Sequence, residues 1–250
     1  MIILLLDDLM LLSGNDIPFP EGQLMIHPLS PKEIGYITER NYFLGIDLLN
    51  FSKDKLSEQD RSRLVNQSDF DVLMSILMEQ TTQPDLKERI DAVKMVLTLL
   101  FPCYEISFSN NAIVLQKEKE IPKTINAMNF EAFQSILQQM CLLNKEDKNN
   151  PNYNPQGPKG RALAEKFKKR REKLNNGKTE KIAVYSRYAS ILAVALQLPL
   201  DTIMNYTIYQ IDDQMERHGL YDAWQKYFAA KMAGATGMDD AENWMKDIHP

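Results

Sequence analysis

The last third of this chain constrains the fold most, because its apolar residues follow helical spacing almost without a break. From Ser186 to Met232 they recur every three or four positions, and only Leu198-Pro199 and His218-Gly219 interrupt them. This spacing is typical of amphipathic helices packed against one another. The same region contains no pairing of a nucleophile with a base and no phosphate-binding loop. It therefore favours a protein that works by docking over one that works by chemistry.

Three helices are expected there. The first covers 186–196, and Pro199 opens the second. His218 before Gly219 indicates a helix end, since a cation suits the C-terminal dipole and glycine suits the residue beyond it. The first helix is expected to bury Tyr188, Ile191, Leu192 and Ala195. In the third, one side of an amphipathic helix is formed by Leu220, Ala223, Trp224, Tyr227, Phe228 and Lys231.

The N-terminal part predicts a mixture of short strands and helices. Short apolar runs at 2–6, 17–19 and 24–26 indicate strands. Ser30, Pro31 and Glu33 have the pattern of a capped helix start, and this helix is expected to run to about Gly45. Further along, the pattern predicts helices at 69–79, 85–100 and 130–143, the last capped by Asn129, and a β-hairpin over 104–115.

A change of composition follows the last of these helices. Residues 144–160 hold three prolines, two glycines and five asparagines, which is typical of a linker or a long ordered loop. The sequence therefore predicts an α+β fold, mostly α, in three parts. These are an N-terminal α+β domain over 1–143 with a small β element and a hairpin, a linker over 144–160, and a basic helix with an α-helical subdomain over 161–250.

Charge is strongly segregated in the chain. Residues 159–181 hold ten Lys or Arg against three Glu, a local charge of +7. The net charge of the whole chain is −5, so the remaining residues together carry −12. A helix is expected over about 160–175, and it has three interpretations. It is a solvated surface helix, or it contacts an acidic partner or an acidic face of this protein, or it binds nucleic acid in a way that salt weakens. Its candidate contact residues are Lys166, Lys168, Lys169, Arg170, Arg171 and Lys173.

No group of residues has the pattern of a catalytic, metal or cofactor site. The three histidines lack a second ligand at metal spacing, and the two cysteines lack Cys-x-x-Cys spacing. The adjacent acidic pairs are interpreted as solvated charge, the histidines as surface or capping residues, and the cysteines as buried reduced thiols. These residues are His27, His218, His249, Cys103, Cys141, Asp7-Asp8, Asp212-Asp213 and Asp239-Asp240.

Composition places the chain among soluble globular proteins, with 44% hydrophobic and 25% charged residues. The apolar start is broken by Asp7 and Asp8 and lacks the basic flank of a signal peptide. No apolar stretch reaches the roughly 20 residues of a membrane span. The expected location is the cytoplasm, without a membrane partner.

The last stretch predicts a short helix over 240–248, capped by Asp239 with Glu242 three residues on. So short a helix is marginal alone in water, so it needs a surface to dock on. That surface belongs either to its own domain or to a partner. Together with the third helix, this gives four candidate docking residues: Trp224, Tyr227, Trp244 and Ile248.

Several segments taken together resemble proteins from the tail gene modules of tailed bacteriophages that infect Gram-positive bacteria. They are Asn129-Phe130-Glu131-Ala132-Phe133, Tyr153-Asn154-Pro155, the basic run 161–173, Thr207-Ile208-Tyr209-Gln210-Ile211 and the ending 233–249. The resemblance covers about 25–250 and is one of overall layout.

The resemblance implies a non-enzymatic tail protein. Its role would be that of a tail assembly chaperone beside the tape-measure protein, or of a minor tail or baseplate component. It would act in the host cytoplasm during assembly or in the virion tail. The alternative, argued from charge, is a nucleic-acid-binding accessory protein that uses 159–181.

Overall fold

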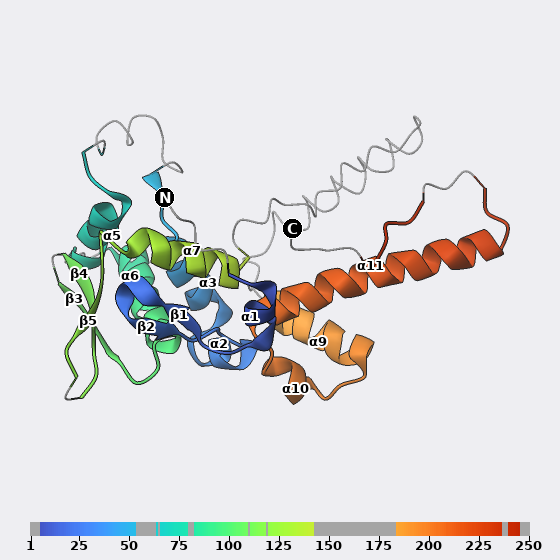
Figure 1. The fold of residues 1–250 in the computed structure, drawn as a ribbon, viewed down its shortest axis with the longest axis horizontal. Coiled ribbons are helices and arrows are strands. Elements are labelled where there is room, and N and C mark those ends of the chain that lie inside the picture. Colours follow the sequence, from blue (N-terminus) through green and yellow to red (C-terminus); the bar gives the residue numbers. More distant parts are fainter. Residues whose placement is uncertain are drawn as a thin grey trace.

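The computed structural model has an α+β fold that is mostly helical, as the sequence predicts. A three-stranded sheet lies at one end of the body, and one long helix, α11, projects from the other end (Figure 1). The residues that the structure describes are 6–53, 64, 66–79, 83–109, 111–118, 120–142, 184–236 and 240–245. The strand predicted at 2–6 therefore lies almost wholly outside the described residues, and the linker 144–160 and the basic helix lie entirely outside them. The division into domains stays a prediction.

The chain begins with a short helix and a small antiparallel pair of strands. Helix α1 (Asp8–Ser13) is capped by the Asp7 side chain, which accepts a hydrogen bond from the Leu9 N–H. Strands β1 (Ile17–Phe19) and β2 (Leu24–Ile26) follow at the predicted positions and pair around the turn η1 (Pro20–Gly22). Both strands alternate buried and more exposed residues, so their apolar side chains enter the core.

The helix start at Ser30 is confirmed, but the single helix to Gly45 is wrong. The structure has α2 (Pro31–Ile37) and α3 (Glu39–Leu49), separated by Thr38 at φ 73°. The Thr38 side chain accepts a hydrogen bond from the Asn41 N–H and so starts the second helix. Gly45 lies inside α3, where a Cβ would come within 2.7 Å of the Ala92 carbonyl oxygen. Glycine thus permits close helix packing there.

Helices α5 (Asp69–Met78) and α6 (Pro84–Leu100) confirm two predictions. Ser68 and Asp71 form the reciprocal capping box that opens α5. Strands β3 (Glu105–Ser109) and β4 (Ala112–Gln116) form the predicted hairpin, and β5 (Lys123–Asn126) adds a third strand that the sequence pattern missed.

Helix α7 (Phe130–Met140) is present, but its predicted side-chain cap is wrong. The Asn129 side chain does not cap α7. Instead its Oδ1 accepts from the Asn126 N–H, and its Nδ2 donates to the carbonyls of Thr124 and Glu21. Asn129 is buried, and these bonds tie β5 to the β1–β2 turn. An asparagine directly before an apolar helical stripe gave no signal that its partners would lie outside the helix.

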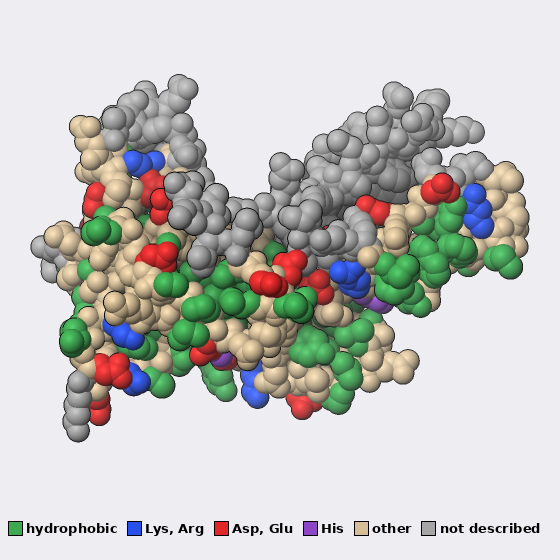
Figure 2. Space-filling model, viewed as in Figure 1, with side chains coloured by type: hydrophobic (Ala, Val, Ile, Leu, Met, Phe, Trp, Pro, Cys, Tyr) green, Lys and Arg blue, Asp and Glu red, His purple; other side chains and the backbone are tan. Residues whose placement is uncertain are grey.

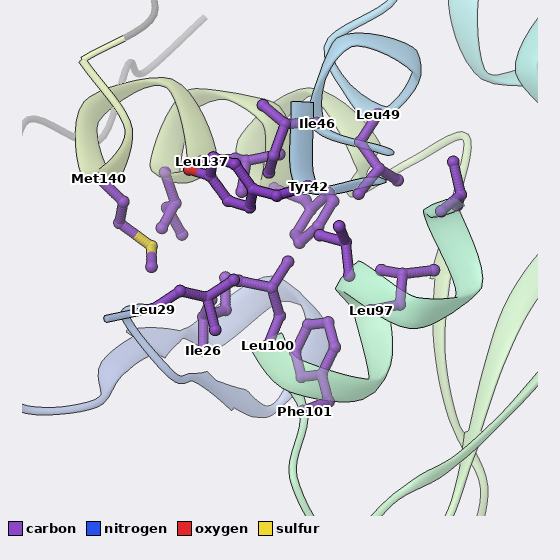
Figure 3. Close-up of a cluster of buried hydrophobic side chains, with 14 of the residues drawn as sticks. Ile26, Leu29, Tyr42, Ile46, Leu49, Leu97, Leu100, Phe101, Leu137 and Met140 are labelled. Carbon is purple, nitrogen blue, oxygen red and sulfur yellow. The ribbon is translucent and has the colours of Figure 1, made fainter. Parts of the chain in front are cut away.

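The core is one continuous cluster between α3, α6, α7 and the first hairpin (Figure 3). The Phe133 ring of α7 is fully buried and lies 5.9 Å from the Phe19 ring and 6.1 Å from the Phe101 ring. The C-terminal helices contribute side chains to the same cluster: Tyr185, Ala189, Leu192, Ile203, Ile208, Tyr209 and Ile211.

The C-terminal helices differ from the prediction in three ways. They are α9 (Val184–Leu196), α10 (Leu200–Met204) and α11 (Ile208–Met232). The single helix expected from Pro199 to His218 is divided, since one helix ends at Met204 and another begins at Ile208. Helix α11 passes straight through His218 and Gly219, so the helix end predicted there is wrong. In α9 Ile191 is exposed, and the buried positions are Tyr185, Ala189 and Leu192. Among the described residues, no helix is long and apolar enough to cross a membrane.

Candidate docking surface on helix α11

The first two turns of α11 are fixed to the body by three hydrogen bonds. The Ile208 N–H donates to the Leu29 carbonyl at 2.9 Å, and the Gln210 side chain donates to the Leu12 carbonyl at 2.6 Å. The Tyr209 hydroxyl donates to the Asp8 carboxylate at 3.0 Å. Thr207 and Gln210 also form a capping box. The helix therefore leaves the body from a rigid base.

The preceding helix, α9, is held by a carboxylate from the N-terminal half of the chain. The Glu39 side chain accepts from the N–H groups of Val184 and Ser186 at 2.5 and 2.8 Å. Next to it the Tyr42 hydroxyl donates to the Cys141 Sγ at 3.3 Å, and burial raises the pKa of that thiol to about 11. Cys141 is thus a protonated packing residue at neutral pH. Cys103 is exposed, so the expectation that both thiols are buried is wrong for that residue.

Beyond its base, α11 leaves the core. Its buried residues, Ile208, Tyr209, Ile211 and Asp213, all fall within the first six positions. We call the remainder, Gln214–Met232, the arm (Figure 1). Buried Asp213 also corrects the interpretation of Asp212-Asp213 as solvated charge.

One side of the arm carries four aromatic rings in mutual contact, which we call the aromatic face. The Trp224 ring centroid lies 4.5 Å from that of Phe228 and 6.2 Å from that of Tyr221. Tyr227 meets Phe228 edge-on at 5.6 Å. The Phe228 side chain is 48% exposed, and hydrophobic side chains are visible along this helix in Figure 2. Clusters of Trp and Tyr with open apolar surface are typical of protein interfaces.

The residues after the arm fold back onto it, and we call Asp240–Met245 the return segment. The Trp244 ring meets the Tyr221 ring edge-on at 5.2 Å, and the Trp244 carbonyl accepts from Arg217 Nη1 at 3.1 Å. The Tyr227 hydroxyl donates to the Asp240 carboxylate at 2.6 Å. Residues 240–245 are not helical, so the helix predicted from 240 is wrong over that stretch. Of the two predicted surfaces, this structure has the one on the chain itself.

The structure brings together three of the ten predicted partner-binding residues, Trp224, Tyr227 and Trp244. Tyr221 and Phe228 complete the cluster. Neither was among the predicted docking residues, although Phe228 was in the predicted stripe of this helix. A signal for both existed, because they lie three residues before and four after Trp224 and so share its side of a helix. The other seven lie outside the described residues: Ile248, Lys166, Lys168, Lys169, Arg170, Arg171 and Lys173.

A second polar cluster lies on the body, around His27. Its Nδ1 is 2.8 Å from Asp16 Oδ1, and its Nε2 is 2.8 Å from Glu33 Oε1. The Glu33 and Asp16 carboxylates outweigh partial burial and raise the pKa of His27 to about 9. Burial opposes ionisation of Glu33, but hydrogen bonds from His27 and Ser30 lower its pKa to about 2. His27 is thus a charged bridge between β2 and α2 rather than the surface or capping residue expected.

The His27 cluster is not a metal site by its geometry. Within the described parts of the chain, no group of three His, Cys, Asp or Glu side chains is arranged to hold a metal ion. The arm and its return segment are therefore the strongest functional candidate.

Comparison with known proteins bears on this same region. Residues 185–249 match the family model described as the YomV second domain. That family is associated with bacteriophages. The match begins at the start of α9 and includes the whole arm and the return segment. No curated protein and no solved structure matches the chain. The similarity to a YomV second domain supports phage association, whereas placement in the tail module stays a prediction.

Proposed function

We propose that this protein is a non-enzymatic phage tail protein that docks onto other tail proteins through the aromatic face of α11. Its role is that of a tail assembly chaperone or of a minor tail or baseplate component. The observation that carries the proposal is the position of this face. It lies on a helix that projects from the body, inside the stretch similar to a phage-associated domain.

The physical argument starts from the cost of the exposed rings. Apolar surface loses about 25 cal/mol of favourable transfer free energy for each Å² left in water. The body buries five phenylalanines, so the chain is able to bury such rings; they are Phe19, Phe70, Phe101, Phe130 and Phe133. The arm leaves Phe228 and Tyr221 more than a third exposed. A partner that covers them gains this free energy at the centre of an interface.

The expected partners are tape-measure or baseplate proteins, met in the host cytoplasm during tail assembly. A component would remain in the virion tail, whereas a chaperone would leave. These two roles use the same surface and differ only in the lifetime of the contact. Recovery of the protein from purified particles distinguishes them.

The alternative function is nucleic-acid binding through 159–181. It rests on the local charge of +7, and those residues lie outside the described part of the chain. Such binding falls by orders of magnitude between low and moderate salt, because each neutralised phosphate releases counterions. Docking through the aromatic face is mainly apolar and persists at moderate salt.

The test is a tagged pull-down of the full chain from phage-infected host cells, with and without nuclease, read by quantitative mass spectrometry. Wild type is expected to recover tail proteins in both halves. The double variant Tyr221→Ala/Phe228→Ala is expected to lose them by more than about tenfold. The matched control is Ile121→Ala, since Ile121 is 87% exposed and lies between β4 and β5, whose sheet is at the end of the body away from α11 (Figure 1).

Two outcomes would contradict the proposal. Equal recovery of tail proteins by the double variant would remove the aromatic face from the interface. Partners that disappear after nuclease treatment would favour the nucleic-acid alternative.

A further inference from the structure

We propose that the return segment is an autoinhibitory cover, which occupies part of the aromatic face until a tail partner displaces it. This inference deepens the proposed function, on which it rests for the role of that face. Two ligands then compete for one surface: Asp240–Met245 of the same chain and the tail protein.

The return segment contacts side chains through which we propose that docking occurs. The Trp244 ring meets the Tyr221 ring edge-on at 5.2 Å, and the Tyr227 hydroxyl donates to the Asp240 carboxylate at 2.6 Å. Two of the four rings of the aromatic face are therefore engaged by the chain itself. A partner that covers Tyr221 and Tyr227 has to take the places of Trp244 and Asp240.

The contacts of the return segment are open to solvent. None of the residues 240–245 is buried, and the segment is not helical. Ordering such a segment costs conformational entropy, and contacts made beside water recover only part of that cost. Segments with few buried contacts are the ones that open locally while the rest of a protein stays folded. A partner can therefore displace this segment without unfolding the arm.

The position of the segment in the chain compensates for its weak contacts. Asp240 follows Tyr227 by 13 positions, so the segment stays close to the aromatic face after it is released. A ligand tethered by a short linker acts at an effective concentration on the order of millimolar. Weak contacts at that concentration are enough to exclude a partner that binds only weakly. A partner that covers the whole face binds more tightly and displaces the segment.

The open part of the face offers such a partner its first contact. Phe228 is 48% exposed although the return segment is in place, and its ring lies 5.6 Å from that of Tyr227. Met232, one helical turn further on, is 88% exposed. A partner that packs on Phe228 first has Tyr227 and Tyr221 next in line, and it gains their apolar area only by removing the segment.

The main test is the pull-down of the full chain from infected cells, made with Asp240→Ala/Trp244→Ala. This double variant removes both side-chain contacts between the return segment and the rings. Recovery of tail proteins is expected to rise by roughly threefold or more, because the apparent affinity increases with the fraction of chains whose face is open. Trp244→Phe keeps a ring on Tyr221 and should stay near wild type. The matched control is Met245→Ala, since Met245 lies in the same segment and is 68% exposed.

A second measurement contains no phage protein. The dye bis-ANS fluoresces on exposed apolar surface. It should fluoresce more strongly with purified Asp240→Ala/Trp244→Ala than with wild type at equal protein concentration. Adding Tyr221→Ala and Phe228→Ala to that variant should cancel the increase, because the dye then lacks the rings that the release uncovers. Far-UV circular dichroism confirms that each variant keeps its helices.

Two results would overturn the proposal. One is lower or unchanged recovery of tail proteins by Asp240→Ala/Trp244→Ala, since the segment would then belong to the docking surface or have no influence on it. The other is unchanged dye fluorescence, which would mean that the segment covers nothing. Failure of the proposed function is a different result, namely equal recovery by wild type and Tyr221→Ala/Phe228→Ala. The dye measurement is independent of it.

Discussion

The body and the arm use the same kinds of side chain at the same helical spacing, and yet they treat them in opposite ways. In the body, Phe133 and its neighbours are almost completely enclosed by helices and strands. On the arm, Phe228 and Tyr221 contact other rings but remain more than a third exposed. The comparison teaches that an apolar stripe on a helix predicts a contact without predicting what makes it. In the body, other helices and strands of the same chain cover the apolar stripe. On the arm, we propose that a partner protein covers it.

The largest expected effect comes from truncating one ring in each region. Phe133→Ala should lower the free energy of unfolding by about 3–5 kcal/mol, because it leaves a cavity in a closed core. Phe228→Ala should lower it by about 1 kcal/mol or less, since its ring is already half in water. Urea unfolding of the full chain measures both. Equal losses for the two variants would mean that the arm is part of the core.

A second variant tests the joint between the two regions. Glu39→Ala removes the acceptor for the first N–H groups of α9, and the expected loss is about 1–2 kcal/mol. Glu39→Gln keeps one acceptor oxygen and should recover part of it. Hydrogen exchange of the first α9 amides reports the effect directly. Wild-type exchange rates in Glu39→Ala would show that the carboxylate is not needed for the helix start.

The body has a pH dependence that comes from the His27 bridge. The folded pKa of His27 is about 9, above its ordinary value of 6.5, so its bridge contributes fully below 6.5 and is lost as the pH rises through about 9. The folded pKa of Glu33 is about 2, so its contribution is present above 4.5 and is lost as the pH falls through about 2. Both shifts describe one bridge, worth about 1 kcal/mol at this exposure.

The measurement is the free energy of unfolding of wild type and His27→Gln between pH 5 and pH 10, in steps of about one unit. The difference between the two proteins should be largest at the acid end and shrink as the pH approaches 10. A difference that stays constant with pH would show that His27 contributes by packing alone.

The smallest expected effect concerns the arm as an isolated helix. Gly219 lies in its interior with no atom within 4 Å of a Cβ position, so Gly219→Ala meets no obstacle. Alanine should stabilise the exposed helix by about 0.5–1 kcal/mol. Amide hydrogen exchange measures this stabilisation: exchange should become slower over the arm and stay unchanged in the body. Faster exchange would mean that glycine is needed where it stands.

Local signals explain why much of the fold was predictable. Ser30 with Glu33 and Ser68 with Asp71 cap helices through residues three positions apart, so the sequence contains the whole motif. The β3–β4 hairpin has the same advantage, since its strands alternate and its turn is short. These features need no knowledge of the rest of the chain.

The features that the sequence did not predict depend on contacts with residues far away in the chain. Thr38 adopts a positive φ with no glycine to announce it, and β5 is a polar strand that exists through its pairing with β4. The buried state of Asp213 follows from the position of α11 against the body.

The candidate site was predictable in part, because the spacing of its residues along one helix can be read from the sequence. Trp224 and Tyr227 share a helix side by spacing, and Phe228 and Tyr221 follow from the same rule. The position of Trp244 was misjudged because a capping pattern at 239–242 predicted a helix, whereas contacts with Tyr221, Arg217 and Tyr227 hold the segment in another shape. The function of the basic residues in 159–181 remains a prediction that rests on composition alone.

Tyr42 contacts a residue just after α7 and a residue at the start of α9. Its hydroxyl lies 3.3 Å from the Cys141 Sγ, and its ring centroid lies 5.9 Å from that of Tyr185. Cys141 and Tyr185 are 44 positions apart in the sequence. A loop whose ends already meet can lengthen cheaply, since doubling its length costs only about 0.6 kcal/mol of closure entropy. Related chains are therefore free to differ greatly in length between α7 and α9 while keeping the same body and arm.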